Sequence, residues 1–230
     1  IPPSVTVIGG YAFSGCSSLT SISIPPSVTE IGGWAFFGCK SLTSITIPAS
    51  VYIHDKNPFT NCPNLTSIVV AEGNEKFDSR NNCNAIIWVG NGRFSTYLVV
   101  GCANTVIPDD VEMICSDAFS GSGITEIEIP DNVKEISREA FKDCKELTRV
   151  VIPDSITTIE SGTFKGCVKL THVEIPWSVE KIYDSVFEGC TSLTDLVNTE
   201  SFMEITNYMY RGCTGLTRIE IPAGTTKIGQ

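Results

Sequence analysis

The sequence lacks the residue patterns that usually mark an enzyme. It contains no G-x-S-x-G nucleophile motif, no phosphate-binding P-loop and no glycine-rich dinucleotide motif. Only two histidines are present, His54 and His172, and the repeat described below places them far apart. The cysteines never occur as C-x-x-C, the short spacing typical of a zinc site. We therefore predict no catalytic residues, no metal and no cofactor.

Charged residues are scarce, and their balance is acidic. They make up 18% of the chain, and the formal net charge is −10 at pH 7. Nucleic acids and anionic membrane surfaces are therefore poor partners. No apolar run approaches the ~18 residues that suggest a spanning helix, so we expect no direct membrane insertion. Neither a signal peptide nor polar capping repeats are present, and we interpret the chain as a fragment of a longer protein.

What the sequence does have is a repeat with a step of 23 residues almost everywhere. Its clearest copy occupies residues 24–46 and reads IPPSVTEIGGWAFFGCKSLTSIT. Copies open with isoleucine and proline, beginning at Ile1, Ile24, Ile47, Ile107, Ile129, Ile152, Ile175 and, cut short, Ile221. Burying about five large apolar side chains gains roughly 8–15 kcal/mol, whereas ordering the backbone costs roughly 1–2 kcal/mol per residue. One copy therefore cannot fold alone, and the copies must stack.

Within each copy, the apolar spacing predicts a strand and a turn. Leu42, Ile45 and Ile47 form the pattern L-x-x-I-x-I, a short strand with two isoleucines on one face. The following proline ends the strand, because it has no N–H to donate to a ladder. An extended return segment comes next. The spacing from Phe36 through Cys39 to Leu42 predicts one tight helical turn.

One column of the repeat predicts a corner with left-handed backbone. It holds glycine, asparagine or aspartate in every clear copy, and these residues tolerate a positive φ better than the others do. The column consists of Gly15, Gly38, Asn61, Gly121, Asp143, Gly166, Gly189 and Gly212.

The full pattern, L-x-x-I-x-I-P-x-x-V-x-x-I-x-x-x-A-F-x-x-C, resembles the BspA-like leucine-rich repeats of bacterial and protist surface proteins. The match is carried by residues such as Leu42, Ile45, Ile47, Pro48, Ala35, Phe36 and Cys39. The resemblance implies an α/β fold, a right-handed leucine-rich-repeat solenoid. Its parallel sheet would lie on one face, with short helical turns and extended segments on the other. The resemblance also implies adhesion or recognition at the cell surface or outside the cell.

On this interpretation the chain is a single solenoid, residues 1–230. Residues 1–69 hold three repeats, 70–106 a longer hairpin-containing unit, 107–220 five repeats and 221–230 a truncated repeat.

The longer unit carries a hairpin signal. Residues 84–89 and 94–100 are rich in strand-forming residues and flank Asn91 and Gly92, which favour an antiparallel hairpin. We interpret the unit as a bridge that keeps the solenoid continuous rather than as a functional loop. In the repeat before it, His54 replaces the apolar residue of the return segment, and we interpret it as a buried or edge histidine bonded locally.

The ten cysteines fall into two groups. Seven share one column of the repeat, in which Ser122 is the exception: Cys16, Cys39, Cys62, Cys144, Cys167, Cys190 and Cys213. A disulfide framework would place pairs within a unit, so we interpret the column as buried free thiols that pack as small apolar side chains. Cys83, Cys102 and Cys115 stand outside the column, and the sequence leaves a Cys83–Cys102 bridge open.

Two lines of side chains should point outward from the stacked strands, with neighbours about 4.8 Å apart. The first line is Ser21, Ser44, Ser67, Asn104, Glu126, Arg149, His172, Asp195 and Arg218. The second is Ser23, Thr46, Val69, Val106, Glu128, Val151, Glu174, Val197 and Glu220. Opposite charges on adjacent strands stabilise a sheet by a few tenths of a kcal/mol, so a self-paired ladder explains most of the pattern. The alternative is a ligand face built from Glu126, Arg149, His172, Glu174, Asp195 and Arg218.

A second candidate surface lies on the turn side. Tyr11 and Trp34 share a column and should stack as neighbours, with Phe37 close by. Exposed aromatic residues that gather on one surface suggest contact with a partner or a sugar. Packing of the same rings over the glycine pairs at 9–10 and 32–33 explains them equally well.

Together, these features favour a non-enzymatic recognition or adhesion module that binds a protein or matrix ligand. One alternative is a structural spacer within a larger surface protein. Another is a glycan-binding module that uses Tyr11 and Trp34.

Overall fold

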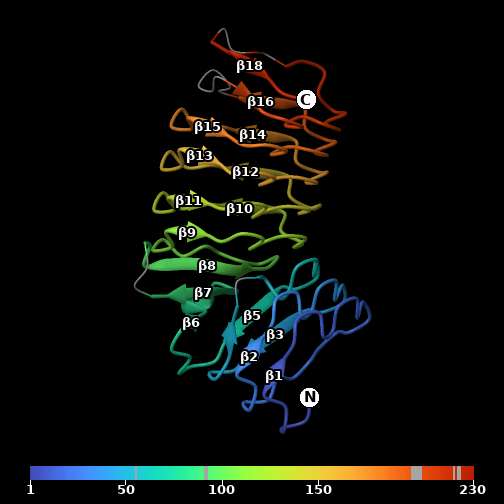
Figure 1. The fold of residues 1–230 in the computed structure, drawn as a ribbon, viewed down its shortest axis with the longest axis vertical. Coiled ribbons are helices and arrows are strands. Elements are labelled where there is room, and N and C mark those ends of the chain that lie inside the picture. The colour runs from blue at the N-terminus through green and yellow to red at the C-terminus, as the bar shows by residue number, and fades with distance from the viewer. Residues whose placement is uncertain (55, 91–92, 198–203, 220, 222–223) are drawn as a thin grey trace.

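The computed structural model describes residues 1–54, 56–90, 93–197, 204–219, 221 and 224–230. The chain winds into a stack of coils made of short strands and turns (Figure 1). A regular coil contributes two strands, one from the L-x-x-I-x-I segment and one from the return segment. The fold is thus a β-solenoid of leucine-rich repeats.

The L-x-x-I-x-I segments lie side by side as parallel strands. In the N-terminal coils, β3 (Ser44–Ile47) pairs with β5 (Ser67–Val70). In the C-terminal coils, the order is β10 (Glu126–Glu128), β12 (Arg149–Val151), β14 (His172–Glu174) and β16 (Asp195–Val197). Exposed and buried residues alternate along these strands, because successive side chains point to opposite faces of a sheet. We refer to the outward side of β10, β12, β14 and β16 as the strand face.

The return segments form a second set of parallel pairs. In the N-terminal coils the order is β1 (Val7–Ile8), β2 (Glu30–Ile31) and β4 (Tyr52–Ile53). In the C-terminal coils the pairs are β9 (Met113–Ile114) with β11 (Glu135–Ile136), β13 (Thr158–Ile159) with β15 (Lys181–Ile182), and β17 (Glu204–Ile205) with β18 (Lys227–Ile228).

The predicted α/β class and its short helical turns are wrong. Within the described residues, the one helix is the short 3-10 helix η1 (Arg80–Asn82). The turn of each regular coil holds two left-handed residues, such as Trp34 with φ 57° and Gly38 with φ 70°. A right-handed helix needs consecutive residues with φ of about −63°, so two left-handed residues four positions apart exclude it.

The predicted corner column is confirmed. All eight of its members have φ between 56° and 77°: Gly15, Gly38, Asn61, Gly121, Asp143, Gly166, Gly189 and Gly212.

A column of stacked aromatic rings runs through the core. In the C-terminal coils, Phe119, Phe141, Phe164, Phe187 and Tyr210 stack with neighbouring ring centroids 4.9 to 6.3 Å apart. The four phenylalanines have no exposed surface. Each coil therefore packs its ring against the coils on both sides, and this is the stabilisation that a single repeat lacks.

The longer unit contains the predicted antiparallel pair. Strand β7 (Ala85–Val89) pairs with β8 (Thr96–Gly101), while Asn91 and Gly92 lie outside the described residues. On one side β8 pairs in parallel with β9, and on the other β7 pairs with β6 (Phe77–Asp78). The division of the chain into the four stretches proposed from the sequence stays a prediction.

This hairpin separates the N-terminal coils, which contain β1 to β5, from the C-terminal coils, which contain β9 to β18, on one side of the molecule. On the turn side, the coils join directly, because the N–H of Asn61 donates to the carbonyl of Ser120 at 3.0 Å and the side-chain amide of Asn57 donates to the carbonyls of Asp117 and Ala118 at 2.9 and 3.1 Å. On the return side, β8, β7 and β6 follow β9 in one sheet, and the ring of Tyr52 in β4 packs against that of Phe77 in β6. Figure 1 shows the result: the N-terminal coils are inclined to the C-terminal stack. We call this bend the elbow.

Candidate functional site

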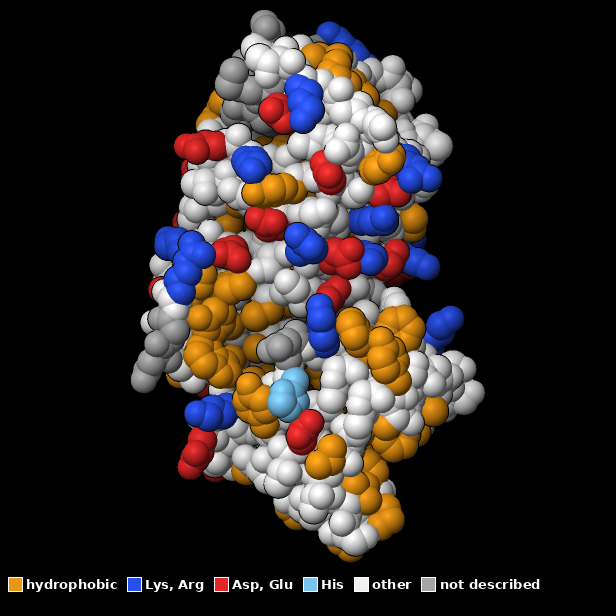
Figure 2. All heavy atoms as spheres, in the orientation of Figure 1, with side chains coloured by type: hydrophobic (Ala, Val, Ile, Leu, Met, Phe, Trp, Pro, Cys, Tyr) orange, Lys and Arg blue, Asp and Glu red, His pale blue; other side chains and the backbone are white. Residues whose placement is uncertain are grey.

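The strand face presents a charged line in the predicted register. Glu126 pairs with Arg149, Arg149 with His172, and His172 with Asp195 along the sheet. Glu126 and Arg149 are exposed and His172 is half-buried. Figure 2 shows charged side chains of both signs gathered over the C-terminal coils, whereas the N-terminal coils present few.

These charges do not pair as a self-satisfied ladder would require. In the described part of the chain, Glu126, Arg149 and His172 make no ion pair within 4 Å, although ion pairs form elsewhere, such as Lys165 with Glu188 at 2.8 Å. The register of the predicted ladder is therefore present without its salt bridges. The strand face keeps its charges available to solvent or to a partner.

The second outward line continues this surface. Glu128 pairs with Val151 and Val151 with Glu174, and all three are exposed. A shallow hollow of about 390 Å³ lies on the same face and is lined by Glu126, Ile127, Glu128, Arg149 and Val151. Arg218 is exposed and lies outside any strand, and the side chain of Asp195 is outside the described residues.

The aromatic pair on the turn side is also present. The rings of Tyr11 and Trp34 stack with their centroids 5.4 Å apart, as predicted, and Tyr11 is 57% exposed. The ammonium group of Lys56 lies 5.5 Å from the centroid of the Trp34 ring. The Trp34 ring is thus flanked by a ring and a cation and offers less free surface than its place on the outside implies.

The repeat column that contains Tyr11 and Trp34 has a left-handed backbone, which the sequence analysis did not predict. Tyr11, Trp34, Asp117, Glu139 and Ser185 all adopt positive φ, between 57° and 61°. Backbone hydrogen bonds hold them there, such as those from the N–H of Phe37 to the carbonyl of Trp34 at 2.9 Å and from that of Lys142 to Glu139 at 3.0 Å. Large side chains rarely adopt a left-handed conformation, and of the left-handed residues in this column only Asp117 and Gly162 are types that favour it, so residue type carried a weak signal.

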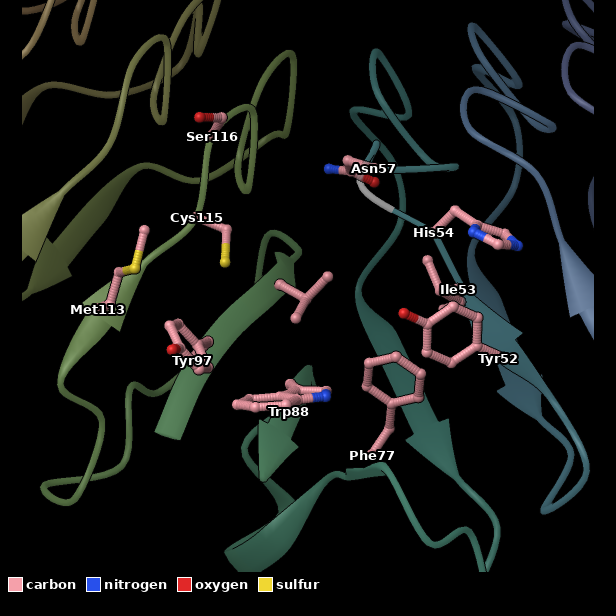
Figure 3. Close-up of a pocket in the computed structure, with 11 residues that line it drawn as sticks. Tyr52, Ile53, His54, Asn57, Phe77, Trp88, Tyr97, Met113, Cys115 and Ser116 are labelled. Atoms are coloured by element: carbon pink, nitrogen blue, oxygen red, sulfur yellow. The ribbon is translucent and has the colours of Figure 1, made fainter. Parts of the chain in front are cut away.

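A pocket that the sequence analysis did not predict lies at the elbow. It has a volume of about 400 Å³ and is lined by Tyr52, Ile53, His54, Asn57, Phe77, Trp88, Tyr97, Val99, Met113, Cys115 and Ser116. We call it the elbow pocket. Its walls come from the N-terminal stack, the hairpin unit and the C-terminal stack (Figure 3). Figure 2 shows hydrophobic side chains gathered where the two stacks meet.

Aromatic contacts hold the walls of the elbow pocket in place. The rings of Trp88 and Tyr97 lie 4.6 Å apart between centroids, and those of Tyr52 and Phe77 lie 5.9 Å apart. The ring of Tyr52 also contacts His54 edge-on, at 4.9 Å. A pocket of this size lined by aromatic side chains is the usual form of a small-molecule site.

His54 lies at the edge of the pocket, not in the core. Its side chain is 51% exposed, and its Nε2 lies 3.2 Å from a carboxylate oxygen of Glu30. The interpretation of an edge histidine with a local partner is therefore supported, but its assigned place in the repeat is wrong, because Ile53, not His54, pairs with Ile31 between the return strands. The sequence analysis missed its neighbourhood, because Trp88 and Tyr97 pair within the hairpin unit while Tyr52 and Met113 come from the coils before and after it, and the bend brings these segments together.

The thiol column is largely as predicted. The thiols of Cys39, Cys62, Cys144, Cys167, Cys190 and Cys213 donate to the carbonyl of the phenylalanine one coil earlier, at 3.0 to 3.3 Å. These six are buried, whereas Cys16 is exposed because it lies in the first coil. All ten cysteines are free, so the possible Cys83–Cys102 bridge is not formed.

The buried thiols are poor nucleophiles. Burial raises the pKa of Cys62, Cys190 and Cys115 to about 12 and that of Cys213 to about 11. The charge of Glu135 adds to the rise in the pKa of Cys115. Because the thiolate is the reactive form, these groups stay protonated and inert at neutral pH.

We expect the cysteines to differ sharply in alkylation. At pH 8 in the folded protein, iodoacetamide should modify Cys16 first and leave the six buried column thiols unmodified. In denaturant without reductant, all ten cysteines should react. Mass spectrometry of tryptic peptides measures both states. A bridge between consecutive column members, such as Cys144 and Cys167, would contradict this account.

Known proteins share the repeat of this chain. A family model described as BspA type leucine rich repeat region matches residues 1–87 and 100–230 in six copies. The search of the curated proteins found no match. In the described residues, no helix is long and apolar enough to cross a bilayer.

Several solved structures have the same fold. A leucine-rich cell surface protein from Faecalibacterium prausnitzii is 28% identical with a TM-score of 0.79, and the match covers 100% of this chain and 58% of that protein. A leucine-rich repeat protein from Bacteroides ovatus is 30% identical with a TM-score of 0.63, covering 100% and 52% respectively. The pneumococcal vaccine antigen PcpA is 22% identical with a TM-score of 0.68, covering 99% and 61%, and shows the fold alone. The chain therefore spans only about half to three fifths of these proteins.

Proposed function

Because the chain belongs to the BspA type leucine-rich-repeat family, we propose that it is a non-enzymatic recognition module. On this proposal it is part of a cell-surface or secreted protein and binds a protein or matrix ligand. Its stack of repeats serves as a rigid support for adhesion. The description of the F. prausnitzii relative as a cell surface protein supports the location.

The observation that carries the proposal is the unpaired charge on the strand face. Glu126, Arg149 and His172 lie in register on a flat sheet, and in the described residues none of them forms an ion pair. Charges that a fold leaves unpaired are available to complement a partner, and they steer its approach and set its register. Glu174, Asp195 and Arg218 extend the proposed surface in the coils that follow.

Two other functions remain as proposals with their own support. A spacer needs only the rigid stack and no binding surface. A glycan-binding module would use Tyr11 and Trp34, and the 57% exposure of Tyr11 favours it. The stacking of the two rings on each other weighs against it, because a stacked face is not open to a sugar.

The test is a screen of the chain against purified matrix proteins and glycans, followed by variants. For a protein ligand, we expect Arg149→Ala and Arg218→Ala to weaken binding by roughly five- to tenfold, with a loss that grows at low salt. The change in the free energy of unfolding should stay within about 1 kcal/mol. Lys169→Ala is the matched control, because it also removes a cation. The ammonium group of Lys169 lies outside the strands and pairs with the carboxylate of Glu146, with 2.5 Å between the two groups.

The outcomes separate the candidates. Unchanged affinity for both arginine variants would rule out the strand face as the site. A loss with Trp34→Ala alone would assign binding to the aromatic pair. No binding by the parent chain to any probe would favour the spacer.

A further inference from the structure

The elbow pocket differs from the strand face in both shape and chemistry. The strand face is charged and only shallowly hollowed, whereas the pocket is lined largely by aromatic and aliphatic side chains. We propose that the elbow pocket binds one neutral pyranose ring of a glycan. This proposal does not depend on the strand face, because no residue lines both.

The aromatic rings suit the apolar face of a sugar. A pyranose presents C–H groups on its faces and hydroxyl groups around its edge. The C–H groups pack on an aromatic ring, whose face carries partial negative charge. Figure 3 shows the indole ring of Trp88 lying across one end of the pocket, with Tyr52 and Phe77 beside it. The volume of about 400 Å³ is within the usual range for a small-ligand site.

The position of the Trp88 ring is set by its surroundings. A Cβ atom on Gly90 would lie 2.0 Å from the Cη2 atom of Trp88, so only glycine leaves room for the ring there. The ring of Trp88 also packs against the ring of Tyr97, with 4.6 Å between the two centroids. A ring that is held in place before binding loses little conformational entropy when a ligand packs on it.

Polar groups at the pocket have unused hydrogen-bonding capacity. In the described part of the chain, the indole N–H of Trp88 and the hydroxyls of Tyr52 and Ser116 have no hydrogen-bond partner. The hydroxyl of Tyr52 points into the pocket in Figure 3. Such groups donate to and accept from the hydroxyls around the edge of a sugar. An entirely apolar ligand would leave them unpaired, and that is unfavourable where a ligand excludes water.

The pocket also favours a neutral sugar over an acidic one. No Asp, Glu, Lys or Arg side chain is among the described residues that line it. The imidazole of His54, at the rim, already contacts the carboxylate of Glu30 at 3.2 Å. The amide of Asn57 is committed to the carbonyls of Asp117 and Ala118. A uronic acid would therefore bury its charge without a cationic partner, at a cost.

The test uses saturation-transfer NMR and calorimetry with methyl glycosides of glucose, galactose and mannose, each beside its uronic acid counterpart. At least one neutral glycoside should bind. Trp88→Ala should weaken it by about tenfold or more, and the uronic acid counterpart should bind several-fold more weakly than the neutral sugar. Arg149→Ala should leave this binding unchanged.

Milder variants guard against misfolding. Trp88→Phe keeps an aromatic face but removes the N–H, and Tyr52→Phe removes one hydroxyl from an exposed side chain. Each should weaken binding by about three- to fivefold while thermal unfolding stays as in the parent. Trp34→Ala and Trp177→Ala are the controls, and neither should alter affinity.

Four results would overturn the proposal. The first is that no neutral glycoside binds. The second is that binding survives Trp88→Ala but is lost with Trp34→Ala. The third is equal affinity for uronic acids. The fourth is that N-acetyltryptophanamide binds at the pocket while no sugar does, which would make it a site for protein side chains.

Discussion

Replacing Phe141 with alanine is expected to lower the free energy of unfolding by about 3–5 kcal/mol. The ring has no exposed surface and stacks between Phe119 and Phe164, at centroid distances of 4.9 and 5.6 Å. Its loss leaves a cavity at the centre of the C-terminal stack and removes contacts with two neighbouring coils at once. Denaturant unfolding followed by circular dichroism measures the change.

Two further variants separate the causes. Phe141→Leu keeps most of the apolar volume and should cost less than about 1.5 kcal/mol. Trp177→Ala removes a larger ring that is 61% exposed, and its effect should stay within about 0.5 kcal/mol. If Phe141→Ala cost no more than Trp177→Ala, the aromatic column would not be the source of stability between coils.

Gly189→Val should destabilise the protein by about 1–3 kcal/mol through the backbone alone. Gly189 has φ 77°, which a β-branched residue almost never adopts. Space is not the cause, because an added Cβ would lie 3.7 Å from the Cα of Gly166. Thermal and denaturant unfolding both report the change.

Gly189→Asn is the matched control for this position. Asn61 and Asp143 already occupy the same column with φ 60° and 56°. Asparagine should therefore cost about 1 kcal/mol or less, although it is as large as many other residues. Equal unfolding curves for the parent and the valine variant would mean that the corner does not need a left-handed residue.

The turn segment shows where sequence reasoning failed. The spacing from Phe36 to Leu42 matches a helical turn, and Gly38 correctly marked one left-handed corner. The left-handed conformation of the second residue, Trp34, was not predicted, because tryptophan seldom adopts it. The bond within the turn from the N–H of Phe37 to the carbonyl of Trp34 is joined by hydrogen bonds between coils, such as that from the N–H of Phe36 to the carbonyl of Pro58 at 2.9 Å. Those bonds exist only when coils stack.

The candidate sites divide in the same way. The register of Glu126 with Arg149 followed from the repeat, because residues one period apart become neighbours on adjacent strands. Whether their side chains pair depends on rotamers and local geometry, which the period does not specify. The elbow pocket was hidden from the period, since Tyr52 and Met113 share the first position of the return strand but are held apart by the hairpin that carries Trp88, which has no counterpart in the repeat.

The sequence by itself determined the stacked repeat, its strand register, its apolar columns and its glycine-type corners. These features repeat from coil to coil, so each copy of the pattern supports the same inference. Only the tertiary structure decided the bend of the stack and the pocket beneath it. The coils of Asn57 and Asp117 meet directly on the turn side, while on the return side β8, β7 and β6 follow β9 and the ring of Tyr52 in β4 packs on that of Phe77 in β6. This difference between the turn side and the return side comes from packing between distant segments at one place in the described chain. A repeating sequence pattern cannot predict a feature that does not repeat.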